Sequence, residues 1–328
     1  MVSKQIKRPN PDKDHIRKRL FVAGLVVFLL VDAGLVALAL RPRDTASAPA
    51  TQMPTAEASV VPQVTPEPEP TRSSPVTVAT IAPTRILAAR DGELAWRATT
   101  GPCGAPALPE FTTDAGETWL ETTATGPTGV VSLQSIVIEG PQVASMIGQN
   151  PDDCAAMFVR TFVAGDNYAE YSADFDGAWF VNPTDRAVIH STTGDIPAPC
   201  DQVIALAPHS DLRASALCDD GAVYVTADGA QTWSTVAATP GAMTIATVGE
   251  GYGVATVGDP TCSGVRLGLF IEPGANPIAP VVPGACVENA LSPEALAGQI
   301  AMADGAGTLW LWAGDSIVRS SDGGLTWL

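Results

Sequence analysis

An eight-residue pattern recurs along this chain and ends in tryptophan each time. Its order is a small hydroxyl residue, any residue, Asp, any residue, Gly, any residue, Thr and Trp, and residues 112–119 and 320–327 match it fully. Residues 226–233 carry a copy with the Gly displaced by one position, and residues 172–179 carry a more degenerate copy. The residues that define the four copies are Asp114, Gly116, Thr118, Trp119; Asp174, Trp179; Asp228, Thr232, Trp233; and Asp322, Gly324, Thr326, Trp327.

Each copy is predicted to be a tight turn between two strands. β-like runs at residues 222–226 and 316–320 lead into two of the copies. In such a turn an Asp side chain accepts hydrogen bonds from nearby backbone N–H groups, and Gly supplies a positive φ. The Trp then begins the outgoing strand and buries its ring against a neighbouring unit. We call these segments Asp-to-Trp turns and predict a structural role for them.

The spacing of the turns predicts a circular array of small sheets. Successive Asp positions are 60, 54 and 94 residues apart, and the last interval is twice 47. Four-stranded blades recur every 40–50 residues or so, so the double interval implies a blade without the pattern, turning near residues 272–276. The first two intervals are longer and require loop insertions. This count gives five blades, with six as the alternative.

The turns resemble the Asp-box, or bacterial neuraminidase repeat, of β-propellers. That resemblance implies an all-β domain over residues 85–328, with each box joining the third and fourth strands of a blade. The chain is also similar to the photosystem II assembly and stability factor propellers, which carry Ser-x-Asp-Gly-Gly-x-Thr-Trp boxes like residues 320–327. This second resemblance implies a non-catalytic scaffold that binds protein, although the Arg-rich binding patch of that family is not recognisable here.

The N-terminal region is predicted to anchor the domain in a membrane. Residues 1–19 are basic, and residues 20–40 form a 21-residue apolar run in which Asp32 is the only charged residue. Such a run spans a bilayer as a helix, and the basic flank places the N-terminus in the cytoplasm. The alternative is a cleaved secretory signal with Ala37-Leu38-Ala39 as its cleavage site. The apolar run is longer than the 7–15 residues or so of a signal peptide, which favours the anchor.

A linker and an extracellular domain follow the apolar run. Residues 41–84 are rich in Pro, Thr, Ser and Glu, which cannot bury enough apolar surface to fold, so they are predicted to form a disordered stalk. The last blade stops directly after Trp327. We therefore expect residues near 76–81, or a strand over residues 85–89, to help close the ring.

The charge is divided sharply between the two ends of the chain. Residues 1–43 carry a net charge of +6 and residues 44–328 carry −23, which sum to the overall −17. A domain this acidic repels nucleic acid and anionic lipid, which excludes both as partners of the domain. We interpret the charge as a source of solubility and expect a monomeric ectodomain.

All six cysteines lie beyond the apolar run, and an even number in an exported domain favours disulfides. Their places relative to the expected strands predict the pairs Cys200–Cys218 and Cys262–Cys286, which leaves Cys103 with Cys154. The sequence has no CxxC motif and no Cys/His cluster, so neither a metal nor another cofactor is expected. His190 and His209 are interpreted as surface or turn residues.

Two functions remain open. Resemblance to sialidases would require three convergent Arg side chains and a Tyr–Glu nucleophile pair, but the Arg residues are scattered and Arg85-Ile86-Leu87 lacks the Pro of the family's signature. A two-carboxylate hydrolase, as in the Asp-box xyloglucan hydrolases, stays possible on pattern alone. The sequence therefore favours a non-catalytic propeller at the cell membrane that binds a protein or a cell-envelope glycan. The alternative is a surface glycoside hydrolase.

Overall fold

The structure is a computed structural model that describes residues 78–270 and 282–328. These residues belong to the second of two compact units, Pro68–Leu328. The basic tail, the apolar run of residues 20–40 and most of the predicted stalk lie outside the described residues. Within the described residues, no helix has the length and apolar character needed to cross a membrane.

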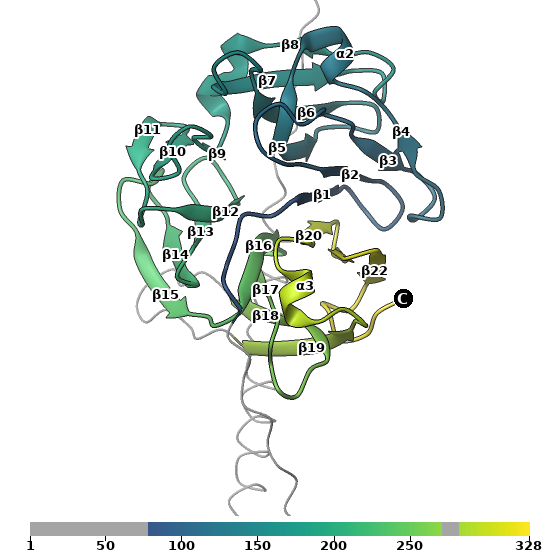
Figure 1. Cartoon of the computed structure of the whole chain (residues 1–328), viewed down its shortest axis with the longest axis vertical. Coiled ribbons are helices and arrows are strands. Elements are labelled where there is room, and N and C mark those ends of the chain that lie inside the picture. The colour runs from purple at the N-terminus through teal and green to yellow at the C-terminus, as the bar shows by residue number, and fades with distance from the viewer. Residues whose placement is uncertain (1–77, 271–281) are drawn as a thin grey trace, which may run out of the picture. The chain divides into compact units, whose positions relative to one another are not determined.

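Six antiparallel sheets make up the described chain, and they are arranged as the blades of a β-propeller (Figure 1). Blades 1 and 2 contain β1 (Arg85–Ala89), β2 (Ala95–Thr99), β3 (Glu110–Thr112), β4 (Leu120–Glu121), β5 (Val131–Ile138), β6 (Ala144–Gln149), β7 (Ala156–Thr161) and β8 (Ala169–Glu170). Blades 3 and 4 contain β9 (Phe180–Val181), β10 (Val188–Ser191), β11 (Gly194–Pro197), β12 (Val203–Pro208), β13 (Ala214–Cys218), β14 (Ala222–Thr226) and β15 (Ser234–Ala238). Blades 5 and 6 contain β16 (Ala242–Val248), β17 (Gly251–Thr256), β18 (Gly264–Phe270), β19 (Val282–Glu288), β20 (Ile300–Gly305), β21 (Thr308–Ala313) and β22 (Ser316–Ser320).

The predicted β-propeller is confirmed, and the prediction of five blades is wrong, because there are six. The interval between Asp228 and Asp322 does contain a blade without the recognised pattern, blade 5. The error lies between Asp114 of blade 1 and Asp228 of blade 4, where two blades occur instead of the single predicted blade with long loops. Blade 2 turns without an Asp at the critical position, and blade 3 has three short strands, so neither produced a recognisable repeat.

The hydrophobic core lies between successive blades. Second strands are buried on both faces, and all five residues of β13 are buried. Side chains alternate along each strand, so one blade contributes to the two packing layers that flank it. Small residues such as Ala214 and Ala216, both fully buried, allow neighbouring sheets to approach closely.

The inner strands define an axis with two mouths. β1, β5, β12, β16 and β20 line it, and consecutive inner strands contact each other at β1–β5, β12–β16, β16–β20 and β20–β1. We call the end where these strands begin the first mouth and the end where they finish the second mouth. The Asp-to-Trp turns between third and fourth strands lie on the side of the second mouth.

Blade 3 is built differently from the others. The turn between β9 and β10 lies at the first mouth, because the Val203 amide at the start of β12 donates to the Arg186 carbonyl at 3.1 Å. The turn between β10 and β11 lies at the second mouth, where the Ser191 hydroxyl donates to the Gly229 carbonyl at 3.0 Å. The three strands therefore correspond to the second, third and fourth strands of a blade. Among the described residues, no strand occupies the inner position.

The ring closes between blades 1 and 6, where β1 lies beside β20 (Figure 1). The expected closing strand over residues 85–89 is β1, whereas residues 78–84 contain no strand. The Thr84 amide and hydroxyl both donate to the Gly298 carbonyl, and the Arg319 guanidinium donates to the Gly92 carbonyl at 2.7 Å. Leu328 pairs with Arg319 of β22 through two backbone hydrogen bonds.

The three predicted disulfides are confirmed as Cys103–Cys154, Cys200–Cys218 and Cys262–Cys286. The first joins the loop after β2 to the loop after β6, so it connects blades 1 and 2. The second ties the connection after blade 3 to β13 of blade 4. The third joins the loop before β18 to β19 within blade 5.

Candidate functional site

Three of the four predicted Asp-to-Trp turns share one hydrogen-bond pattern. In the first turn the Thr112 hydroxyl donates to Asp114 Oδ1 at 2.7 Å, while the Thr118 amide donates to Oδ1 at 2.9 Å and its hydroxyl donates to Oδ2. Asp228 and Asp322 receive the same bonds from Thr232 and Thr326. Every carboxylate oxygen thus accepts from its own turn. These carboxylates are occupied in holding the hairpin.

Two consecutive residues with positive φ complete each of these turns. The pairs are Ala115–Gly116, Gly229–Ala230 and Gly323–Gly324. Positive φ is a left-handed backbone conformation, which Gly adopts without the steric cost that other residues incur. The displaced Gly in the second pair leaves Ala230 in a left-handed conformation, and the Ala230 amide bonds the Thr226 hydroxyl at 3.1 Å.

The tryptophans at the ends of the turns pack between blades. Trp119 meets Trp310 edge-on, with ring centroids 6.4 Å apart. Trp233 packs on the core shared by blades 3 and 4, and Trp327 packs on the core shared by blades 5 and 6. The predicted packing role therefore accounts for the Trp at the last position of these turns.

The fourth copy of the pattern, residues 172–179, is not a hairpin. Its backbone forms a 3₁₀ helix, η1 (Ser172–Gly177), in the connection between blades 2 and 3, and Asp174 falls within that helix. Trp179 follows η1, is buried and precedes β9. The pattern Ser-x-Asp followed by Gly and Trp arises here outside a turn between third and fourth strands.

The corresponding turn of blade 2 lies at residues 161–168, which the sequence analysis missed. The Gly165 amide donates to the Thr161 hydroxyl at 2.9 Å, and Ala164–Gly165 form the left-handed pair. Val163 replaces the Asp and Tyr168 replaces the Trp. A search that required only the hydroxyl residue, the left-handed pair and a final aromatic residue could have found this turn.

A cavity of about 860 Å³ follows the propeller axis. The residues that line it come from β1, β5, β9, β12, β16 and β20, together with the segments at both mouths. The size is within the range of roughly 300–1,000 Å³ that is usual for ligand pockets. Since the axis is the one place where all six blades meet, we take this cavity as the candidate functional site.

Four ionisable side chains line the described part of the cavity: Arg85, Arg186, His209 and Asp304. At the second mouth, Asp304 Oδ2 accepts from the Gly249 amide at 2.8 Å and Oδ1 accepts from the Gly307 amide at 3.1 Å. His209 Nε2 lies 3.1 Å from the Gly249 carbonyl oxygen. His209 and Asp304 thus hold the turn after β16 between blades 4 and 6, as parts of the wall.

Arg186 is the most distinctive group of the first mouth. Its guanidinium donates to the carbonyls of Val203 at 2.7 Å and Ile204 at 3.0 Å. No carboxylate forms an ion pair with it within residues 78–270 and 282–328, and burial lowers the pKa of its guanidinium. A guanidinium has five N–H donors, so Arg186 keeps donors and an uncompensated charge in the cavity wall.

Three further polar groups in the wall have no hydrogen-bond partner in the described chain. They are Gln134 Nε2 on β5, Gln149 Oε1 at the end of β6, and Trp179 Nε1 before β9. Buried polar groups of folded proteins are nearly always hydrogen-bonded. All three belong to residues on the side of the cavity formed by blades 2 and 3.

Arginines do gather elsewhere, at the seam between blades 1 and 6. Arg85 lies over the Trp312 ring at 4.2 Å, and Arg97 lies over the Trp119 ring at 4.1 Å. Burial and the neighbouring charge of Arg97 lower the pKa of the Arg85 guanidinium, and Asp315 opposes them. These cations stack on aromatic rings and stabilise ring closure, so they do not form the convergent carboxylate site of a sialidase.

The described residues of the lining also lack the pair of carboxylates that a glycosidase needs. Asp304 is the one acidic residue in the described lining, and both of its oxygens accept backbone hydrogen bonds. Two-carboxylate hydrolysis requires a second acid roughly 5–10 Å away across the substrate. Nor do the described residues gather three or more His, Cys, Asp or Glu side chains that could hold a metal ion.

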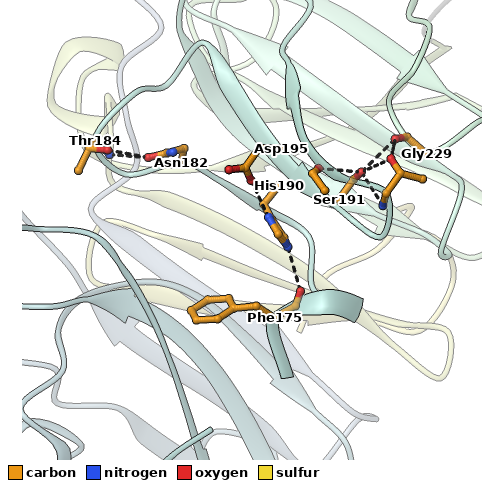
Figure 2. Close-up of polar contacts among 9 residues, drawn as sticks. Phe175, Asn182, Thr184, His190, Ser191, Asp195 and Gly229 are labelled. Atoms are coloured by element: carbon orange, nitrogen blue, oxygen red, sulfur yellow. Dashed lines mark hydrogen bonds and ion pairs between the residues drawn. The ribbon is translucent and has the colours of Figure 1, made fainter. Parts of the chain in front are cut away.

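The surroundings of blade 3 are held firmly by polar contacts (Figure 2). His190 on β10 places Nδ1 2.6 Å from Asp195 Oδ1 and Nε2 3.0 Å from the Phe175 carbonyl oxygen of η1. Asn182 Oδ1 accepts from the Thr184 amide and hydroxyl, which orders the turn that carries Arg186. The site is therefore preformed at both ends of β9.

The fold and cavity define a six-bladed β-propeller with an axial pocket. No protein-family model matches the sequence, and no curated protein matches it. Among solved structures, the chain is similar to YCF48 from Cyanidioschyzon merolae, at 17% identity and a TM-score of 0.40 over 77% of this chain and 85% of that chain. A structure of YCF48 bound to D1 peptide shares 15% identity, with a TM-score of 0.28 over 78% of this chain and 70% of that chain.

An ancestral GH74 enzyme is also similar, at 10% identity and a TM-score of 0.39 over 79% of this chain and 46% of that chain. Identities and scores this low do not transfer a function to this chain. The β-propeller assignment depends on the six sheets themselves.

Proposed function

We propose that this chain is a membrane-anchored propeller that faces the outside of the cell and binds a protein or a cell-envelope glycan in its axial cavity, without catalysis. The observation that carries the proposal is the cavity of about 860 Å³, whose described lining has one carboxylate, already bonded on both oxygens. A cavity of this kind can recognise a ligand but lacks the acid–base pair for hydrolysis.

Three features of the sequence support the location. The basic tail before the apolar run of residues 20–40 favours a cytoplasmic N-terminus, and the stalk would separate the domain from the bilayer. Three disulfides suit an oxidising compartment. We further propose that the three Asp-to-Trp turns are Asp boxes with a structural role.

The topology can be tested with the full chain in bacterial membranes. We expect the protein to resist extraction by alkaline carbonate, and a protease added to intact spheroplasts should remove the propeller from the membrane fraction. A propeller that is protected in intact spheroplasts, or that is released by carbonate, would contradict the proposed anchoring and orientation.

Binding in the cavity can be tested by filling it. Ser135 and Thr247 line the cavity and are partly exposed, so Ser135→Trp and Thr247→Trp should obstruct it. Thr235→Trp, on the exposed outer strand β15, is the matched control. Full-length protein in nanodiscs would be screened against bacterial glycan arrays and peptide arrays. We expect both cavity variants, but not the control, to lose the ligands of the wild type.

The glycosidase alternative is addressed in the same preparations. Incubation with sialosides and with plant and bacterial polysaccharides should give no turnover above that of the Asp304→Asn variant. Turnover that copurifies with the protein and disappears in the cavity variants would replace binding by hydrolysis as the function of this site.

A further inference from the structure

Blade 3 presents an unpaired strand edge to the cavity. β9 pairs with β10 through Ile189↔Val181 and His190↔Phe180, and no strand of the described chain pairs with its other edge. Trp179, Phe180 and Val181 line the cavity directly. In the five other blades, an inner strand pairs antiparallel with the second strand at this position.

The hydrogen-bond alternation shows which groups of this edge are available. The Asn182 amide donates to the Val188 carbonyl at 2.9 Å, which places residues 182 and 188 at a hydrogen-bonded position of the ladder, while the Val188 amide donates to the Asp185 carbonyl. Hydrogen-bonded and non-hydrogen-bonded pairs alternate along antiparallel strands. The backbone N–H and C=O of Val181 therefore point away from β10, toward the inner position of the blade.

The preceding segment is fixed elsewhere. Phe175 of η1 contacts Phe158 on β7 edge-on, with ring centroids 5.9 Å apart, and its carbonyl oxygen lies 3.0 Å from His190 Nε2 (Figure 2). η1 thus fills the space between the outer parts of blades 2 and 3. Its contacts with these third strands hold it away from the axis and leave the inner edge of β9 open.

We propose that an extended segment of a partner protein adds to β9 as the inner strand of blade 3, with an acidic side chain bound by Arg186. This inference rests on the proposed function and narrows its ligand to a polypeptide. Addition of a strand to an exposed sheet edge is a general mode of peptide recognition, in which backbone hydrogen bonds give affinity and alternate side chains give specificity.

The direction of the bound segment follows from the other blades. An inner strand antiparallel to β9 runs like β12, from the first mouth to the second. Arg186 lies at the first mouth, beside the start of β12. The acidic residue should therefore stand at the N-terminal end of the bound segment, before the residues that pair with Val181.

The chemistry of the walls sets the sequence of the segment. Its side chains alternate between the face toward β12, where Leu206 lines the cavity, and the face toward β5, where Gln134 lines it. Apolar residues suit the β12 side. The polar side chain of Gln134, which lines the cavity, suits a hydroxyl or amide on the β5 side.

The charges of the domain and of Arg186 favour an acidic peptide over a neutral glycan as the ligand. Residues 44–328 carry a net charge of −23, which repels an acidic segment from most of the domain surface. An acidic segment is therefore expected to bind only beside a cation that has no ion-pair partner. Arg186 supplies that cation, and its position is fixed by two carbonyl acceptors and by the ordered turn around Asn182. A neutral glycan makes no use of this charge.

Hydrogen exchange provides the test with an internal control. The probe is the peptide acetyl-Glu-Val-Thr-Val-Thr-Val-amide, added to full-length protein in nanodiscs, with residue-level exchange measured by mass spectrometry. The Val181 amide has no partner within residues 78–270 and 282–328 and should exchange rapidly in the free protein, then slow by roughly tenfold or more when the peptide binds. The Asn182 amide already bonds Val188 and should change little.

The peptide itself can report the pairing. N-methylation removes a backbone donor, so methylating alternate residues should abolish binding at the positions that face β9 and leave the intervening positions tolerant. Equal effects at all positions would mean that the peptide does not pair with β9 and would overturn the proposal.

The role of Arg186 is tested by Arg186→Gln, with Arg90→Gln as the matched loss of charge outside the cavity lining. Wild-type protein and Arg90→Gln should prefer the Glu peptide over its Gln counterpart by roughly tenfold, as expected for charged hydrogen bonds. Arg186→Gln should bind both peptides equally. A preference that survives in Arg186→Gln would place the acid elsewhere.

The possible outcomes distinguish strand addition at β9 from the proposed function, which is ligand binding in the axial cavity. Protection of the Val181 amide in the free protein would mean that another part of this chain already fills the edge, which would overturn the partner peptide. Peptide binding that is lost in Thr247→Trp without protection of Val181 would retain the cavity as the site and reject strand addition. If the wild-type protein binds no ligand in its cavity, both the strand addition and the proposed binding function are rejected.

Discussion

At the scale of single residues, the Asp carboxylates of the turns combine exposure with strong hydrogen bonding. The Thr118 hydroxyl and amide, followed by the Thr112 hydroxyl, lower the pKa of Asp114 to about 2. The corresponding bonds from Thr326 and Ser320 lower the pKa of Asp322 to about 2. These carboxylates are therefore more acidic in the folded protein than the ordinary Asp value of about 3.9 in an unfolded chain.

The sign of the pH dependence follows from these shifts. A carboxylate with a lowered folded pKa contributes stability above its unfolded pKa, and this contribution is lost as the pH falls through the folded value. For Asp114 and Asp322 the loss occurs between about pH 4 and pH 2. We predict that Asp114→Asn/Asp322→Asn is less stable than wild type at pH 6 and loses less of its melting temperature between pH 4 and pH 2.

Thermal melts at pH 6, 4, 3 and 2 would measure this difference. Asp211→Asn, which removes an exposed acid outside the turns, should follow the wild-type curve. Parallel curves for the double variant and wild type would show that the turns do not titrate in this range.

Residue patterns predicted the parts of the molecule that depend on local geometry. The turns at Asp114, Asp228 and Asp322 were found because their Asp and Thr bond each other within the same eight residues. Arg186 could not be identified in this way, because its carbonyl acceptors belong to the next blade. A contact between segments that are far apart in the sequence cannot be recognised from a short motif.

At the scale of elements, blade 3 shows why counting repeats gave the wrong number of blades. η1 lies where the connection to an inner strand would run, and the short strands β9 and β10 leave no repeat of normal length. The turn of blade 2 keeps Thr161 and Gly165 but not the Asp. The left-handed turn is therefore present in more blades than the Asp and Trp residues by which it was recognised in the sequence.

The contact between β20 and β1 depends on the absence of a side chain. A Cβ added to Gly305 would stand 2.5 Å from the Arg90 carbonyl carbon and the Asp91 amide nitrogen. We predict that Gly305→Ala forces these inner strands apart and lowers the free energy of unfolding by roughly 1–3 kcal/mol, as overpacking does.

Denaturant titration of full-length protein in detergent would measure the change. Gly177→Ala is the matched control, because nothing lies within 4 Å of its added Cβ. An effect of Gly305→Ala no larger than that of the control would show that β1 and β20 are not in close contact in solution.

At the scale of the whole molecule, the disulfides act on different spans of the chain. Cys103–Cys154 closes 51 residues and joins two blades, whereas Cys200–Cys218 closes 18 residues. Chain-entropy reasoning gives roughly 4 kcal/mol for the longer loop and roughly 3 kcal/mol for the shorter one. We predict that Cys103→Ser/Cys154→Ser destabilises the protein more than Cys200→Ser/Cys218→Ser does.

Unfolding followed by intrinsic tryptophan fluorescence would rank the two double variants. The same order should appear in denaturant midpoints under non-reducing conditions. A reversed order would indicate that strain or residual structure in the unfolded chain outweighs loop length for these bonds.

Because blade 3 has no inner strand in the described chain, the six blades are not related to one another by a simple rotation about the axis. With six complete blades, a molecule entering along the axis would meet a similar strand backbone at every sixth of a turn. With one open strand edge and one uncompensated guanidinium in the wall, a single angular setting differs from the rest. A ligand held there is therefore oriented about the axis as well as positioned along it.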